Sequence, residues 1–301
     1  MKKHLPISIS LLIIFLVAWY VKLLKEKIIP KNIELDTIGS FTAQQTCHKQ
    51  PNFLKKLHIP SPIAIDLSQQ RYKGLAFLYG HNLLKALHLK TWEKFDHFSS
   101  YALDPKGNMY LSPMPYISIK KKTFEFQKNI YKLDTNSGNL SVWMSFDDVY
   151  AGANNPYGVI ALEYDCEDNS LWVSAIDETT YQENKGVIYH IDIDSKTILQ
   201  KVQGIEALSL KLVQSSKGKT LLVGSARNNI LEAYAIQEQR LSNRVLKLFE
   251  LEDANQHVRK IVVRSKNHLK LQAIPFSYSL IAQTQEGTLR KDYNFVWKDE
   301  P

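Results

Sequence analysis

Residues 101–112 read YALDPKGNMYLS, and residues 160–174 read IALEYDCEDNSLWVS. Each stretch is an apolar run, then a turn rich in Asp, Asn, Pro or Gly, then a second apolar run. This order is typical of a β-hairpin. The same order returns at residues 210–225 and again at residues 261–272. The sequence therefore predicts a series of hairpins.

A third strand and its turn repeat after the hairpin. IYKLDTNSG at residues 130–138 overlays IYHIDIDSK at residues 188–196, and residues 231–236 give a weaker copy. A closing strand follows each copy, and a more degenerate early unit precedes them. The closing strands are residues 140–146, 197–202, 244–251 and 288–297, and the early unit spans residues 63–98.

The period of these units indicates the architecture. The equivalent second-strand positions Tyr110, Trp172, Leu222 and Lys270 are 62, 50 and 48 residues apart. Four strands in about 40–50 residues is the repeat of a propeller blade. A β-sandwich would also give short strands, but it does not explain the recurrent fourfold order. We expect an all-β propeller of five or six four-stranded blades over residues 62–301.

The phrases YALDPKGNMYLS, IYKLDTNSG and LEYDCEDNSLWVSAID (residues 162–177) resemble blades of the NHL-repeat, SMP-30/gluconolactonase-like and strictosidine-synthase-like propeller superfamily. The resemblance covers residues 62 to about 250 and implies six blades. In enzymes of the gluconolactonase-like branch it also implies a divalent metal in the central channel, held by a Glu at the entry to the first blade and by later Asn and Asp residues. Residues 62–66 contain no Glu, and only Asn155 matches as a ligand.

The amino-terminal segment predicts a membrane anchor. Leu5 to Val21 contains no charged residue, and the run to Leu24 is twenty residues long, which is about 30 Å of helix and enough to cross a bilayer. Trp19 and Tyr20 end the run at the depth where aromatic rings favour the headgroups. No small-residue cleavage site follows directly, so we expect an uncleaved signal-anchor, with a cleaved signal peptide as the alternative.

The expected organisation is a tail at residues 1–4, a transmembrane helix at residues 5–24, a tether at residues 25–61 and the propeller. The tether holds one possible strand, Asn32 to Phe41, which closes the ring by adding to the last blade. Because only four residues precede the helix, we expect the propeller to be exported, which in a bacterium places it in the periplasm. The lipid bilayer is then a partner through residues 5–24.

The charge distribution argues against nucleic-acid binding. The net charge is +8, but the first 31 residues hold six Lys and one Glu, so the remaining chain carries only +3 (32 Lys and Arg minus 29 Asp and Glu). A nearly neutral body lacks the electrostatic surface that phosphate binding needs. The usual catalytic signatures, such as GxSxG, HExxH, GxGxxG and CxxC, are also absent from the sequence.

Three long connections indicate a binding face. Residues 113–129, 146–158 and 176–186 leave adjacent units at the strand ends where propellers often bind ligands. Their carboxylates and amides suit Ca²⁺, and their tyrosines suit a sugar or a protein. The alternative is that these polar residues only keep exposed loops solvated, which explains the same composition. The candidate residues are Asp147, Asp148, Tyr150, Asn154, Asn155, Tyr157, Asp177, Glu178 and Tyr181, together with Glu183 and Tyr116.

The two cysteines, Cys47 and Cys166, fall in the tether and in a turn of the third readable unit. A disulfide is possible in an oxidising compartment, but we expect two free thiols. The predicted function is a membrane-tethered, extracytoplasmic propeller that presents a face for a protein or a small-molecule ligand. A metal-assisted hydrolase of lactonase or strictosidine-synthase-like type is the alternative, and no catalytic residue can be named.

Overall fold

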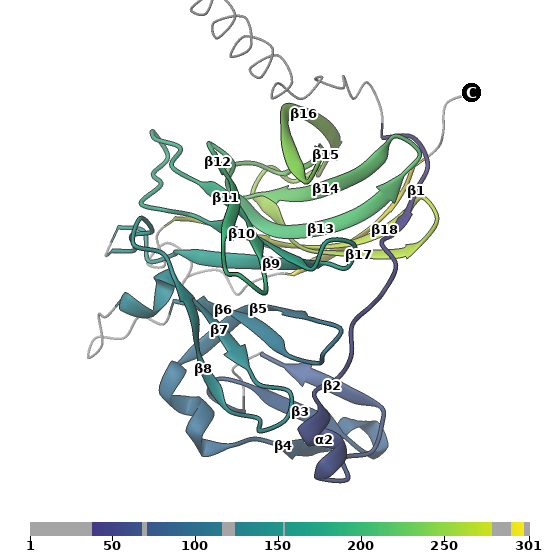
Figure 1. Ribbon diagram of the computed structural model, residues 1–301. Coiled ribbons are helices and arrows are strands. Elements are labelled where there is room, and N and C mark those ends of the chain that lie inside the picture. Colours follow the sequence, from purple (N-terminus) through teal and green to yellow (C-terminus); the bar gives the residue numbers. More distant parts are fainter. Residues whose placement is uncertain (1–37, 68–70, 116–123, 153, 279–289, 298–301) are drawn as a thin grey trace, which may run out of the picture. The chain divides into compact units, whose positions relative to one another are not determined.

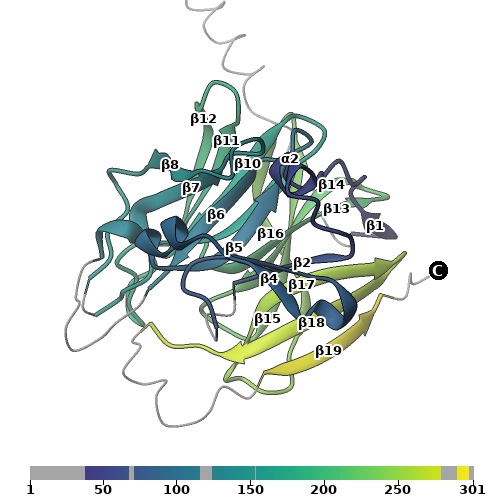
Figure 2. The ribbon, with the colours of Figure 1, turned by 90° about the horizontal axis from the view of Figure 1, so that it is seen from below.

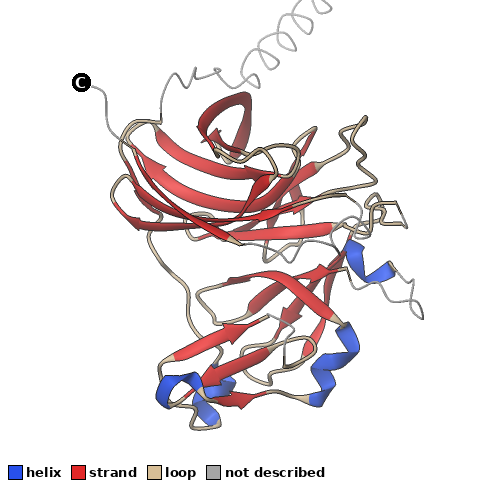
Figure 3. Ribbon diagram, turned by 180° about the vertical axis from the view of Figure 1, so that it is seen from behind, coloured by secondary structure: helices blue, strands red, loops and turns tan. Residues whose placement is uncertain are grey.

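The computed structural model describes residues 38–67, 71–115, 124–152, 154–278 and 290–297. These residues form a five-bladed β-propeller of small antiparallel sheets. Strands predominate, with a few short helices (Figure 3). The compact unit runs from Leu35 to Pro301.

The five sheets follow one another along the chain (Figure 1). The first contains β2 (Ile63–Asp66), β3 (Ala76–Tyr79) and β4 (Lys85–Leu87). The second contains β5 (His97–Leu103), β6 (Met109–Met114), β7 (Asn129–Leu133) and β8 (Leu140–Ser145). The third contains β9 (Val159–Asp165), β10 (Ser170–Ala175), β11 (Val187–Asp192) and β12 (Ile198–Gln203).

The fourth sheet contains β13 (Ala207–Ser215), β14 (Gly218–Ser225), β15 (Ile230–Gln237) and β16 (Arg240–Glu250), and β1 (Phe41–Ala43) pairs with β13. The fifth contains β17 (Gln256–Ser265), β18 (His268–Pro275) and β19 (Lys291–Val296), which lie side by side in Figure 2. The helical segments are α2 (Asn52–Lys56), η1 (His81–Leu83), η2 (Lys90–Phe95) and η3 (Glu125–Lys128).

Side chains that point alternately to the two faces of each sheet's second strand build the core. Successive side chains of a strand point to opposite faces, so adjacent residues enter different clusters: Leu171 packs with the second sheet and Trp172 with the fourth. All six residues of β10 are therefore buried, whereas the outer strand β12 is mostly exposed. Four hydrophobic clusters of buried residues each join two successive sheets. One residue from each of the two sheets represents each cluster: Phe77 and Leu111, Tyr110 and Leu171, Trp172 and Leu221, and Leu222 and Leu271.

Serine hydroxyls repeat at the joints between neighbouring sheets. Each hydroxyl donates to a backbone carbonyl on the first strand of the next sheet, which leaves that carbonyl hydrogen-bonded although it is buried. The three bonds run from Ser112 Oγ to Ile160 O (3.0 Å), from Ser174 Oγ to Ala207 O (2.8 Å) and from Ser209 Oγ to Val258 O (2.7 Å).

Arg259 on β17 connects sheets that are not neighbours in the sequence. Its guanidinium donates to Leu208 O on β13 at 2.9 Å and to Ser99 O on β5 at 3.1 Å, and it also donates to the Ser99 hydroxyl. One side chain of the fifth sheet thus contacts the fourth and the second.

Residues 38–54, here named the strap, cross the ends of four sheets. The strap appears in purple in Figure 1, running from β1 to α2. It contacts the first hairpin turn of each of these sheets: Ser40 and Phe41 meet Ser216 of the fourth sheet and Asn267 of the fifth, Gln44 meets Asp165 of the third, and Lys49 meets Asp104 of the second. The strap therefore fastens one end of the blades.

A disulfide joins the strap to the third sheet. Cys47 and Cys166 are bonded, with their Cα atoms 5.8 Å apart. Our expectation of two free thiols was wrong, because it treated residues 25–61 as a tether separate from the blades. The strap instead lies directly over the β9–β10 turn that carries Cys166.

Three other expectations compare with the structure as follows. The propeller has five blades, so the six-bladed form implied by the resemblance does not apply. Phe41–Ala43 pairs with β13 of the fourth sheet and not with a strand of the last one, and residues 32–37 lie outside the described residues. The predicted span at residues 5–24 also lies outside them. Within the described ranges, no helix has the length and apolar character needed to cross a bilayer.

Candidate functional site

Two of the three predicted long loops contact each other directly. The backbone N–H of Tyr150 donates to the Asp177 carboxylate at 2.7 Å, and the N–H of Glu178 donates to Tyr150 O at 3.2 Å. The N–H of Ile176 donates to Gly158 O at 2.9 Å. Residues 146–158 and 176–186 thus form one continuous surface, here named the two-loop face.

Of the described residues in the third predicted loop, the last ones reach the same region. A Cβ atom on Gly158 would lie 2.3 Å from Gln127 O, so glycine alone permits this close approach. The N–H of Phe146 donates to Lys128 O at 3.0 Å. Residues 116–123, which include Tyr116, lie outside the described residues.

Asn155 fastens the two loops together from the inside. Its amide nitrogen donates to Thr179 O at 2.9 Å and to Ile176 O at 3.4 Å, and its amide oxygen accepts the N–H of Tyr157 at 3.0 Å. The residue is only 3% exposed. Because its oxygen is already engaged in this turn, Asn155 does not fit the metal-ligand role that the resemblance implies. Its neighbour Asn154 is exposed.

Four carboxylates of the two-loop face have partners among the described residues. Asp148 accepts from the Tyr189 hydroxyl at 3.0 Å and pairs with Lys201. Partial burial raises the pKa of Asp148, but these two contacts outweigh it and hold the pKa below its usual value. Burial raises the pKa of Asp177, partly offset by the Tyr150 N–H. Glu178 and Glu183 lie 3.7 and 3.4 Å from Lys185, and Asp147 is exposed.

Among the described residues, no three carboxylates of this face bring their oxygens close together. The only group there with three closely spaced His, Cys, Asp or Glu ligand atoms is Cys47, His48 and Cys166. Two of its three members are already bonded to each other as a disulfide. Closely spaced carboxylates among the described residues therefore do not support the Ca²⁺ interpretation, which stays a prediction.

The predicted tyrosines divide into two groups. Tyr157 is only 2% exposed and packs against Phe276, so its ring belongs to the core. Tyr150 and Tyr181 are 56% and 65% exposed. The Tyr181 ring lies edge-on to Tyr278 at 5.1 Å between centroids.

Three residues that the sequence did not single out hold the face in place. Arg227 donates to Tyr181 O at 2.9 Å and pairs with the buried Glu206 at 3.1 Å. The Tyr278 hydroxyl donates to the same carboxylate, and burial followed by this bond raises the pKa of Tyr278. Arg227 sits in a very short connection, and our loop-length criterion passed over it for that reason.

The arrangement is suited to recognition. Two exposed tyrosine rings project from loops whose backbones are fixed by side-chain hydrogen bonds. Tyrosine is enriched at protein interfaces because its ring gives a large contact area at little conformational cost. The two-loop face thus combines exposed aromatic area with a preformed backbone.

Comparisons with known proteins give no family. No family model matches the chain, and no curated protein matches it. Among solved structures, the chain is similar to a luciferin-regenerating enzyme, with 12% identity, 79% of each chain covered and a TM-score of 0.48.

Two further structures are similar at a lower score. A protein of unknown function from Bacteroides caccae has 11% identity, with 77% of this chain and 90% of that chain covered and a TM-score of 0.38. Kuenenia stuttgartiensis hydrazine synthase has 12% identity, with 72% and 62% covered and a TM-score of 0.42. At these scores the similarities carry no conclusion about function.

Proposed function

We propose that this protein is a membrane-tethered, extracytoplasmic propeller that binds a protein or small-molecule partner on the two-loop face. The anchor is the apolar run at residues 5–24, the segment after it is the tether, and the propeller follows. The protein recognises its partner, and no chemical transformation is part of the proposal.

The Cys47–Cys166 disulfide supports an extracytoplasmic body. Disulfides persist in oxidising compartments and are rare in the cytosol of most organisms. The uncharged run from Leu5 to Val21 supports retention in the membrane. The two features are independent of each other, and both agree with an exported domain on an uncleaved anchor.

The observation that carries the binding half of the proposal is the exposure of Tyr150 and Tyr181 on loops whose backbones are fixed. A preformed loop loses little conformational freedom when a partner docks, so more of the contact energy appears as affinity.

Membrane fractionation tests the location. The full chain should remain in the membrane pellet after an alkaline carbonate wash, and protease added from outside the cytoplasm should reach the propeller. Replacing Leu12 and Phe15 by Lys should abolish anchoring, since each charge costs roughly 2.5–3.5 kcal/mol near the centre of a helix. A soluble wild-type protein beginning after Val21 would show a cleaved signal instead.

Site-specific photocrosslinking tests the face. A photoreactive phenylalanine analogue at position 181 should give a discrete adduct in cells, and Tyr150→Ala should weaken that adduct. The matched control is the same analogue at Leu84, which is also well exposed, at 73%, but lies between β3 and β4 of the first sheet. Equal adducts at positions 181 and 84, or none at position 181, would contradict a binding face here.

A further inference from the structure

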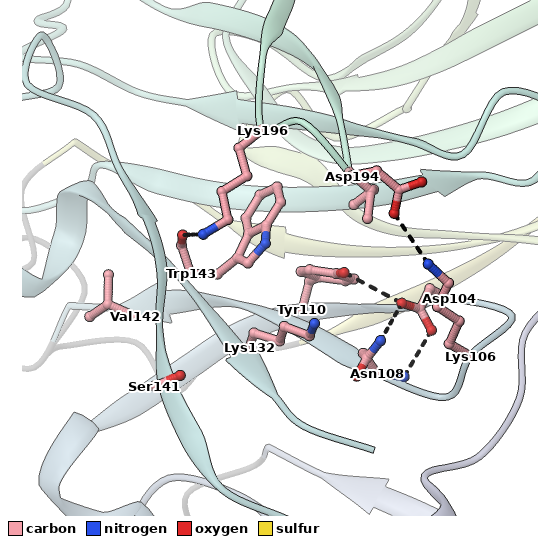
Figure 4. A pocket seen from close by; sticks show the side chains of 11 residues that line it. Asp104, Lys106, Asn108, Tyr110, Lys132, Ser141, Val142, Trp143, Asp194 and Lys196 are labelled. Carbon is pink, nitrogen blue, oxygen red and sulfur yellow. Dashed lines mark hydrogen bonds and ion pairs between the residues drawn. The ribbon is translucent and has the colours of Figure 1, made fainter. Parts of the chain in front are cut away.

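A groove opens between the second and third sheets, at the strap end of the strands and not at the end that carries the two-loop face. Its walls come from the β5–β6 hairpin, from β7 and β8, and from the β11–β12 turn (Figure 4). Its volume is about 370 Å³, within the lower part of the range for small-molecule sites. The groove therefore has room for a small ligand.

Two lysines enter the groove from different sheets. Lys132 comes from β7, and its ammonium lies 6.0 Å from the centre of the Tyr110 ring. Lys196 comes from the β11–β12 turn, lies 5.8 Å from the Trp143 ring and donates to Trp143 O at 3.1 Å. Figure 4 shows the Lys196 ammonium bonded to the Trp143 carbonyl and the Lys132 ammonium near Tyr110, so that the two rings lie between the two ammoniums.

The acidic residues of the groove are already engaged with other groups. Asp104 is buried and accepts from the Asn108 N–H at 2.8 Å, from the Asn108 amide at 2.7 Å and from the Tyr110 hydroxyl at 3.4 Å. Asp194 accepts from Lys106 at 3.2 Å and from Asn169 at 2.8 Å. Neither carboxylate pairs with Lys132 or Lys196 in the described part of the chain.

The groove is also preformed. The strap holds the β5–β6 hairpin through a bond from the Lys49 N–H to Asp104 O at 3.3 Å. A Cβ atom on Gly107 would lie 2.8 Å from Gln50 O, so the hairpin and the strap are in close contact. A site built this way pays little ordering entropy when it binds.

We propose that this groove binds a small hydroxylated organic anion, with its carbon skeleton against the Tyr110 and Trp143 rings and its anionic group within reach of the Lys132 and Lys196 ammoniums that flank them. An ammonium is a compact charge that donates hydrogen bonds to a carboxylate or a phosphate ester equally well. Asp194, Lys106 and the exposed Ser141 hydroxyl can form hydrogen bonds with hydroxyl groups of the ligand. An apolar anion or a bare inorganic ion would leave these protein groups unused. This site is independent of the two-loop face.

Calorimetry on the detergent-solubilised full chain tests the proposal with four probes: glucuronate, glucose 6-phosphate, glucose and inorganic phosphate. The first two should bind, and they distinguish a carboxylate from a phosphate ester. Glucose should bind at least about tenfold more weakly, because it lacks the group that two charge-assisted hydrogen bonds would hold. Inorganic phosphate should also bind more weakly than either sugar anion.

Variants locate the site. Lys132→Gln and Lys196→Gln should each weaken sugar-anion binding about tenfold or more, and Lys132→Arg should retain it because the charge remains. Lys260→Gln is the matched control: it removes one charge from an exposed position on β17, outside the groove, and should change nothing. Circular dichroism of each variant serves as the control for folding.

Several outcomes would overturn the proposal. The first two are that glucose, or inorganic phosphate, binds as tightly as the sugar anions. The third is that sugar-anion binding survives the double Lys→Gln change. The fourth is that neither sugar anion binds at millimolar concentration. None of these results bears on the crosslinking experiment at position 181, so the two proposals fail separately.

Discussion

Cys47 and Cys166 form a disulfide across 119 residues of sequence, and this bond attaches the strap to the turn between β9 and β10. Gln44 strengthens the same junction, because its amide donates to the Asp165 carboxylate at 2.5 Å. The segment that leads toward the predicted anchor is thus covalently part of the propeller.

Removing the disulfide should destabilise the propeller. Cross-linking residues about 120 apart restricts the unfolded chain strongly, so Cys47→Ser with Cys166→Ser should lower the free energy of unfolding by about 2–5 kcal/mol. Urea denaturation of a chain that begins at Leu35 measures this value. A reductant should weaken the wild-type protein and leave the double variant unchanged. A double variant within about 0.5 kcal/mol of wild type would contradict the prediction.

Arg259 should stabilise the fold far more than its exposed neighbour Lys260. Arg259→Met keeps much of the aliphatic stem but removes the donors to Leu208 O and Ser99 O. Leaving such carbonyls without a partner should cost about 2–4 kcal/mol in unfolding free energy. Lys260→Met, which removes the same charge from the next position, should stay within about 0.5 kcal/mol. Similar losses in both variants would indicate a general charge effect.

Two tyrosines of the two-loop face should behave oppositely. Tyr157 is buried against Phe276, so Tyr157→Ala leaves a cavity and should cost about 3–5 kcal/mol of stability. Tyr181 is largely exposed, and Tyr181→Ala should cost less than about 1 kcal/mol while reducing partner binding. Thermal unfolding separates the two results. A Tyr157→Ala protein that melts like wild type would show that the ring is not part of the core.

Acidification should weaken the fold through His257. Burial lowers the pKa of His257, although the backbone groups of Ser225 and Asn228 oppose the shift. The folded state then keeps the imidazole neutral while the unfolded chain protonates below about pH 6.5, so stability is present above that pH and is lost as the pH falls. The loss reaches at most about 1.4 kcal/mol per pH unit for one proton.

The matched variant for this pH effect is His257→Gln. Its unfolding free energy should fall less than that of wild type between about pH 7 and about pH 5, because one titrating group has been removed. His190, whose pKa burial also lowers, remains in both proteins and contributes equally. Parallel pH profiles for wild type and variant would contradict the role given to His257.

The strands and their order could be predicted from the sequence. The hairpin at residues 101–112 appears as β5 and β6, and the repeat at residues 188–196 begins with β11 and its turn. Alternation and turn residues act over only a few positions, so a single strand such as Ser170–Ala175 is specified locally. The blade count was left at five or six because the chain length allows either, and the degenerate first unit forms a sheet of three strands in the structure.

Only the tertiary structure decided which distant residues meet. The pairing of Cys47 with Cys166, the burial of Tyr157, the support of Tyr181 by Arg227 and the groove between Lys132 and Lys196 all join different sheets or the strap to a sheet. Local patterns fix a strand and its turn. Contacts between segments far apart in sequence depend instead on the packing angles of whole sheets and on the path of the strap, and no short stretch of sequence encodes those.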